Sequence, residues 1–189
     1  MNSNILLNRL PLYTPSGLEI RTDFRESIKF ELLMQDSKIK DVDKIEIALN
    51  LYFYKAIPDI EKAVKEMIWF YTGGKEEKKT SQKENKQEKQ KQIYSYEFDA
   101  DYIYSAFLQQ YKIDLNSIKY MHWWKFKALF EGLTDETQIV KIMGYRAIDL
   151  GQLKDKEEKK RYKKLQKLYA LPDMRTEEQK EADFGKAFW

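Results

Sequence analysis

Apolar residues recur along most of the chain with the spacing of amphipathic helices. The clearest case spans residues 58–71, where one stripe consists of Ile60, Ala63, Val64, Met67, Ile68 and Tyr71. These positions follow i, i+3, i+4, i+7, i+8 and i+11, which predicts a helix that buries this stripe. Pro58 suits the first turn of the helix, and Gly73 and Gly74 follow its end. Trp69 lies opposite the stripe, so we expect it to pack against a neighbouring helix or an insertion, or to be an exposed anchor for a partner.

Similar patterns predict helices in other parts of the chain. Asp23 and Glu26 have the spacing of a capping box, which begins a helix over residues 23–35. The residues expected on its buried side are Phe24, Ile28 and Leu32. Further helices are expected over residues 42–55, 118–130 and 155–171, with one more capped by Thr134. Another should begin at Asp99 or Asp101 and reach Tyr111.

The segment before these helices has no helical period. Pro15, Ser16 and Gly17 are turn formers between two short apolar runs in residues 9–21, which favours a small β-hairpin, or at least an extended segment. The predicted fold class is therefore mainly α: a compact bundle of six or seven helices with a small N-terminal β-hairpin and a mobile charged insert.

The insert is the stretch KEEKKTSQKENKQEKQKQ at residues 75–92, which has no apolar side chain. Such a segment cannot bury enough surface to offset the entropy of ordering, although Lys, Glu and Gln would also suit a solvated helical extension. We expect a single helical domain over residues 1–171, interrupted by a flexible polar linker at 74–92, and a flexible tail over 172–189. Two helical halves packed together remain an alternative. The insert also holds the whole net charge of +3, so the rest of the chain is not a basic domain.

The stretch SIKYMHWWKFKALFEGL, residues 117–133, is apolar around almost the whole circumference of a helix. A helix of this kind is normally surrounded by protein, so it is expected at the centre of the fold or as a core helix with one side left for a partner. His122, the single histidine, is expected to be structural. Trp123 and Trp124 point about 100° apart on a helix, and each indole N–H needs an acceptor.

The composition gives little support for catalysis. The chain has no cysteine and one histidine, and it shows neither a phosphate-binding loop nor a nucleophile–base arrangement. We therefore expect no enzyme, and no catalytic, cofactor or metal-binding residues. The absence of a long apolar run or signal-like start predicts a protein of the cytoplasm without a membrane partner.

Surface residues that could bind a partner come from three of the predicted helices. The candidates are the aromatic residues Trp69, Tyr120 and Trp124, and the basic residues Arg161 and Lys164. Residues 154–167 carry eight Lys and Arg against three acids, which leaves nucleic-acid binding as an alternative but is more typical of a solvated face.

The core HWWKFKALFEGLTDETQIVKIMGYR resembles the phage gene-product-15 family, found in tailed phages and prophages of Gram-positive bacteria. The residues that carry the resemblance are His122, Trp123, Trp124, Phe126, Gly132, Leu133, Tyr145 and Arg146. IRTDFRESIKFELLMQD at residues 20–36 and the closing lysine-rich helix also resemble that family, so the likeness spans most of residues 5–170.

The resemblance implies a tail assembly chaperone, made in the cytoplasm of the bacterial host. Such a protein binds the helical tape-measure protein, and tail-tube subunits or a second tail chaperone are further partners that the resemblance allows. A structural component of the tail or neck is the alternative function. The family carries no established catalytic residues, and the sequence leaves the oligomeric state open.

Overall fold

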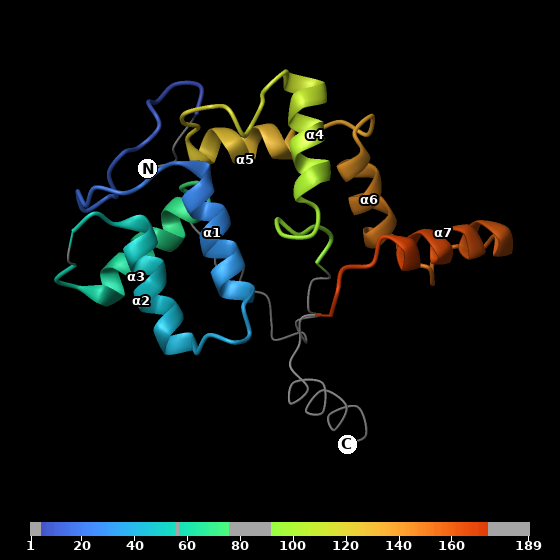
Figure 1. Ribbon diagram of the computed structural model, residues 1–189, viewed down its shortest axis with the longest axis horizontal. Helices are drawn as coiled ribbons and strands as arrows, with labels where there is room; N and C mark the ends of the chain where they lie inside the picture. Colours follow the sequence, from blue (N-terminus) through green and yellow to red (C-terminus); the bar gives the residue numbers. More distant parts are fainter. Residues whose placement is uncertain (1–4, 56, 76–91, 174–189) are drawn as a thin grey trace. The chain divides into compact units, whose positions relative to one another are not determined.

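The computed structural model describes residues 5–55, 57–75 and 92–173. These residues form seven α-helices, which agrees with the predicted mainly α class (Figure 1). Their bounds are α1 (Phe24–Gln35), α2 (Asp41–Tyr52), α3 (Ile60–Tyr71), α4 (Ala100–Tyr111), α5 (Trp123–Glu131), α6 (Gln138–Ala147) and α7 (Lys156–Leu168). Within the described ranges there is no β-sheet, only isolated bridges between single residues.

The described residues group into two compact units. The first unit contains α1, α2, α3 and residues 120–125, and the second contains residues 92–119 and 126–171 with α4, α6 and α7. Helix α5 begins in the first unit and continues into the second. The single domain over 1–171 stays a prediction. Most of the expected linker at 74–92 and nearly all of the expected tail at 172–189 lie outside the described residues.

Helix α1 is the first helix of the first unit and packs against α2. Asp23 caps it by accepting a hydrogen bond from the Arg25 backbone N–H at 3.0 Å, as the sequence predicts, while the Glu26 carboxylate pairs with Lys29 instead of completing the box. The buried face differs from the expected one: Ile28 and Leu32 are only half-buried. The buried residues are instead Phe24, Ser27, Phe30 and Leu33. This face is turned inward because the Ser27 hydroxyl contacts Tyr52 of α2 and accepts its O–H at 2.9 Å.

Helix α3 buries Ala63 and Met67 of its predicted apolar stripe, but its buried face also includes residues outside the stripe. Ile60 and Ile68 of the stripe are 60% and 42% exposed, whereas Glu66 and Phe70 are buried. The Glu66 carboxylate accepts hydrogen bonds from the Thr14 and Ser16 hydroxyls and the Ser16 backbone N–H, so a charged residue is held inside. Asp59 caps this helix, and Pro58 precedes it rather than entering its first turn.

The predicted N-terminal β-hairpin is wrong. Gly17, with φ +87°, makes the expected tight turn, but the only ladder contact across it is one bridge between Tyr13 and Glu19. The following segment finds other partners: Ile20 bridges Phe53. The chain therefore has an extended N-terminal segment rather than two paired strands.

The second unit is built around α6, which packs against α4 and α7. Its core contains Ile103, Phe107, Phe126, Ile139 and Ile142. The rings of Phe107 and Phe126 stack with centroids 4.9 Å apart.

Two predicted helix starts are too early. The helix expected from 118 begins at Trp123, because His122 forms an extended bridge with Asp23 just before it. The helix expected directly after Thr134 begins at Gln138, because residues 134–137 form a turn closed by a bond from the Thr137 N–H to the Thr134 carbonyl.

Candidate functional site

The two adjacent tryptophans close the end of α3. The Trp123 indole N–H donates to the Tyr71 carbonyl at 2.8 Å, and the Trp124 indole N–H donates to the Phe70 carbonyl at 2.7 Å. The last carbonyls of a helix have no partner inside it, so these indoles act as side-chain caps. The expectation that each indole finds its own acceptor is confirmed.

Ring packing strengthens the same junction. Trp123 stacks on Tyr71, with centroids 5.5 Å apart and an interplanar angle of 13°, and Trp124 stacks on Phe70. Trp69 meets the Trp124 ring edge-on at 5.5 Å. Aromatic pairs of this geometry contribute beyond the area they bury. The junction belongs to the first unit, and its indole N–H groups are used in structural hydrogen bonds.

His122 is a structural residue at the start of α5, and it is 4% exposed. Its Nδ1 accepts a hydrogen bond from the Trp124 backbone N–H at 3.0 Å, so the proton of the neutral ring is on Nε2, which donates to the Pro11 carbonyl at 3.0 Å. Burial lowers the pKa of His122 below its ordinary value of 6.5, and the hydrogen bond to Pro11 partly opposes this shift. The imidazole therefore caps α5 in its neutral form.

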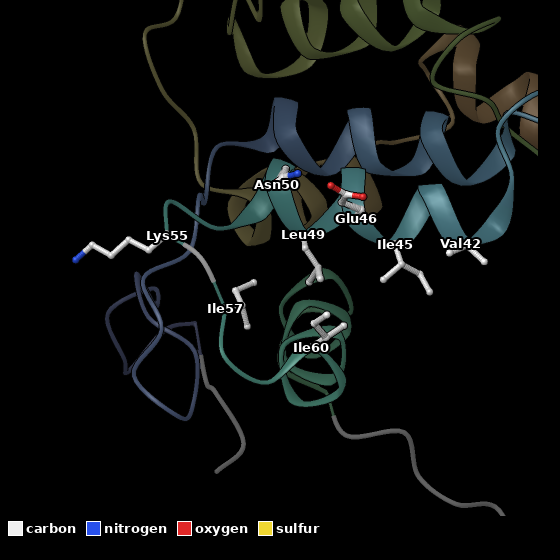
Figure 2. Close-up of a pocket in the computed structure, with 8 residues that line it drawn as sticks. All are labelled: Val42, Ile45, Glu46, Leu49, Asn50, Lys55, Ile57 and Ile60. Carbon is white, nitrogen blue, oxygen red and sulfur yellow. The ribbon is translucent and has the colours of Figure 1, made fainter.

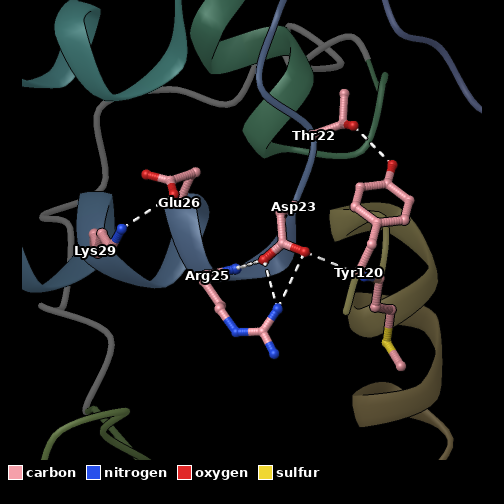
Figure 3. A network of polar contacts seen from close by, with 7 residues as sticks. Thr22, Asp23, Arg25, Glu26, Lys29 and Tyr120 are labelled. Carbon is pink, nitrogen blue, oxygen red and sulfur yellow. Dashed lines mark hydrogen bonds and ion pairs between the residues drawn. The ribbon is translucent and has the colours of Figure 1, made fainter. Parts of the chain in front are cut away.

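A polar network joins the start of α1 to the segment before α5, as Figure 3 shows. The Asp23 carboxylate accepts from the Met121 backbone N–H at 3.2 Å and pairs with the Arg25 guanidinium. Tyr120 and Thr22 share a hydrogen bond between hydroxyls at 2.7 Å. These contacts fix two segments that are far apart in the sequence, and their geometry indicates a structural role.

An open apolar groove with a volume of about 550 Å³ lies between α2 and α3. Figure 2 shows Val42, Ile45 and Leu49 on the side of α2 that faces Ile57 and Ile60. We call these five residues, with Glu46, Asn50 and Lys55 at the edge, the α2–α3 groove.

Three of the five aliphatic residues that line the α2–α3 groove are exposed, while Leu49 is buried and Ile57 is half-buried. Val42 is 79% exposed, Ile60 60% and Ile45 46%. The sequence interpretation did not single out any of these as partner-binding residues. A signal was present in DVDKIEIALNLY, because its apolar residues occupy more of the helix circumference than one neighbouring helix can cover.

The aromatic residues predicted to bind a partner differ in their accessibility. Trp124 is 5% exposed, so the expectation that it lies on the surface is corrected: its ring packs between Phe70 and Trp69. Trp69 is half-buried, and Tyr120 is 53% exposed with its hydroxyl bonded to Thr22. A role of Trp69 or Tyr120 in partner binding stays a prediction.

Arg161 and Lys164, the two basic candidates, are both exposed on α7. This helix has no buried residue, and its half-buried Tyr162 lies beside Tyr145 of α6 in the second unit. The structure thus brings these two candidates together on one peripheral helix. They are not grouped with Trp69, Tyr120 or Trp124, which belong to the first unit.

Within residues 5–55, 57–75 and 92–173, no group of three or more acidic or histidine side chains is placed to hold a metal ion. None of the helices in that part of the chain combines the length and the apolar character that a bilayer crossing requires.

Comparison with known proteins places the chain in one family. No curated protein and no solved structure matches it significantly. The model of the Bacteriophage Gp15 protein family matches residues 7–171, which include all seven helices and the tryptophan junction. The chain therefore belongs to the Bacteriophage Gp15 protein family.

Proposed function

We propose that this protein is a non-catalytic tail assembly chaperone that binds the tape-measure protein during tail morphogenesis. Membership of the Gp15 family indicates a protein of phage structure or morphogenesis. The observation that carries the finer proposal is the exposed α2–α3 groove, because a chaperone for a helical client needs an apolar surface that is open while the client is absent.

The groove has the properties expected of a site for an amphipathic helix. Its anchors Val42, Ile45 and Leu49 are spaced i, i+3 and i+7 along α2, and Ile57 and Ile60 form the opposite wall. The polar lining residues lie at the edge and are exposed. A site of this kind recognises an apolar stripe rather than one small polar molecule, whose binding requires converging polar groups.

Co-expression with the tape-measure protein of the same phage tests the proposal. We expect a higher soluble yield of the tape-measure protein and co-purification of the two chains. Ile45→Glu should abolish both effects, because it puts a charge into the groove. Ile47→Glu is the matched control: Ile47 lies on the same helix, is 39% exposed and does not line the groove. Separate recovery of the two proteins without a gain in solubility would refute the proposal.

Mass spectrometry of purified virions separates the chaperone from a structural component of the tail or neck. A chaperone acts during assembly and should be absent from finished particles. Detection of this chain at a stoichiometry comparable to tail proteins would instead establish a structural role, and the groove would then be an interface within the virion.

A further inference from the structure

The charges around the α2–α3 groove give its occupant a defined chemistry. Helix α2 has four charged residues, and the only cation among them, Lys44, is buried with its ammonium group 3.1 Å from the Met34 carbonyl. Asp41, Asp43 and Glu46 are all exposed. Asp41 pairs with the Lys44 ammonium group at 3.7 Å, and the exposed Lys40 directly precedes the helix, so Asp43 and Glu46 carry the remaining exposed charge of α2.

The acids lie directly beside the apolar anchors. Asp43 and Glu46 each follow an anchor, Val42 and Ile45, by one residue, so the acidic row runs along the anchor row at the same i, i+3 spacing. In Figure 2 Lys55, the one cation that lines the groove, is at the end opposite Val42. The basic lining residue therefore lies at the far end of the groove from Val42, while the exposed Lys40 stands two residues before Val42 in the sequence.

The opposite wall has acidic neighbours as well. Ile60 stands between Asp59 and Glu61, which are both exposed. The Asp59 carboxylate caps α3, and Glu61 pairs with Lys65, so their charge is partly compensated. On the α2 side, Asp43 and Glu46 are exposed beside the anchors, and their neighbour in the sequence, Lys44, is buried.

From this arrangement we infer that the α2–α3 groove binds an amphipathic helix of another polypeptide whose apolar stripe is flanked by lysine or arginine. The apolar anchors supply attraction, and the acidic row of α2 selects a basic flank and disfavours an acidic one. The inference deepens the proposed function and rests on it for the biological partner, but it concerns a chemical preference that can be measured without that partner.

Two synthetic peptides test the preference on the full-length chain. Both are amphipathic helices of about 20 residues with the same leucine stripe, one with lysine flanks and one with glutamate flanks. Fluorescence anisotropy at low salt should show tighter binding of the lysine peptide by about 2- to 30-fold, the range for two exposed charge pairs. The difference should shrink as salt screens the charges.

Charge reversal in the protein locates the effect. Asp43→Lys combined with Glu46→Lys should abolish or invert the preference. Asp135→Lys combined with Glu136→Lys changes the net charge equally, uses two exposed acids of the second unit, and should leave the preference unchanged. Ile45→Glu should weaken both peptides by at least tenfold, whereas Ile47→Glu should not.

Several outcomes would overturn the inference. Equal affinity for the two peptides, or a preference that survives reversal at Asp43 and Glu46, would remove the electrostatic selection. Light scattering that shows a dimer of the wild-type chain and a monomer of Ile45→Glu would identify a second copy as the occupant. Tighter binding of a peptide of residues 174–189 than of the lysine peptide would identify the chain's own C-terminal segment instead.

The peptide and co-expression experiments can fail independently. If the lysine peptide binds as expected and the tape-measure protein is not bound, the groove chemistry stands and the proposed function is wrong. If the tape-measure protein is bound and Ile45→Glu leaves that binding intact, the proposed function stands and the groove inference is wrong.

Discussion

Neutralising one side of the buried Asp99–Arg146 pair should destabilise the second unit by several kcal/mol. The two side chains are 2% and 7% exposed and form two parallel hydrogen bonds, of 2.6 and 2.9 Å. The guanidinium also donates to the carbonyls of Ile93 and Tyr169, and the carboxylate accepts from the Ser95 backbone N–H. Arg146 thereby links α6 to the segments that precede α4 and follow α7.

The magnitude follows from what each substitution leaves behind. Removing one partner of a buried ion pair strands the other charge and costs about 3–5 kcal/mol. Asp99→Asn keeps the shape and strands the guanidinium, so we expect a loss of about 3 kcal/mol in the free energy of unfolding. Arg146→Met strands the carboxylate and also removes the bonds to Ile93 and Tyr169, so we expect about 4 kcal/mol. The double variant strands neither charge, and its loss should be about 2 kcal/mol smaller than the sum of the two.

Urea unfolding followed by far-ultraviolet circular dichroism measures these three losses. Glu61→Gln is the control, because it breaks the exposed Glu61–Lys65 pair, whose side chains are 82% and 72% exposed. This control should not change stability measurably. Losses below about 1 kcal/mol for both single variants, or strict additivity in the double variant, would show that the pair does not hold the unit together.

Three further predictions concern single sites. The lowered pKa of His122 means that the unfolded chain binds more protons than the folded chain below pH 6.5. The free energy of unfolding should therefore be highest above pH 6.5 and fall as the pH drops through the folded pKa. In His122→Asn, whose amide oxygen can still accept the helix-capping bond, the free energies of urea unfolding at about pH 7.5 and about pH 5.5 should differ much less than in the wild type. Trp124→Phe keeps an aromatic ring but loses the bond to the Phe70 carbonyl and part of a buried side chain, so urea unfolding should show a loss of about 1–3 kcal/mol, and no loss would refute the capping role. Gly17→Ala should lower the melting temperature, with a loss of about 1 kcal/mol in the free energy of unfolding, because the φ of Gly17 is +87°. Gly144→Ala, in an open position inside α6, should raise the melting temperature. Melting temperatures that shift in the same direction for both variants would contradict the conformational argument.

Local sequence signals predicted the helices well. Asp23 caps α1 as expected, and the helix of residues 155–171 is observed as α7 with Asp155 as its cap. The helix expected to start at Asp99 or Asp101 is observed as α4 with Asp99 at its N-cap, where the Asp99 side chain makes no capping hydrogen bond. These signals depend on residues within one or two turns of one another, so they can be found without knowledge of the fold.

The errors arose where a distant segment decides the local structure. Glu66 is buried because Thr14 and Ser16, about 50 residues earlier, donate hydrogen bonds to it. His122 is extended rather than helical because it bridges Asp23, which is 99 residues away in the sequence. Periodicity alone would have placed Glu66 in water and His122 in a helix, because it contains no information on such partners.

The α2–α3 groove is a consequence of the same long-range contacts. Helix α3 is fixed at its middle by the bonds to Glu66 and at its end by the indoles of Trp123 and Trp124. These contacts set the rotation of the helix about its axis, and that rotation buries Phe70 while it leaves Ile60 at the surface. An apolar stripe wider than the core can accept would ordinarily be a liability in water. Ile60 and Ile45 of α2 both line the groove, so the excess apolar surface is concentrated at one place. Trp123 and Trp124 do not line the groove, but they stabilise it by fixing the end of α3.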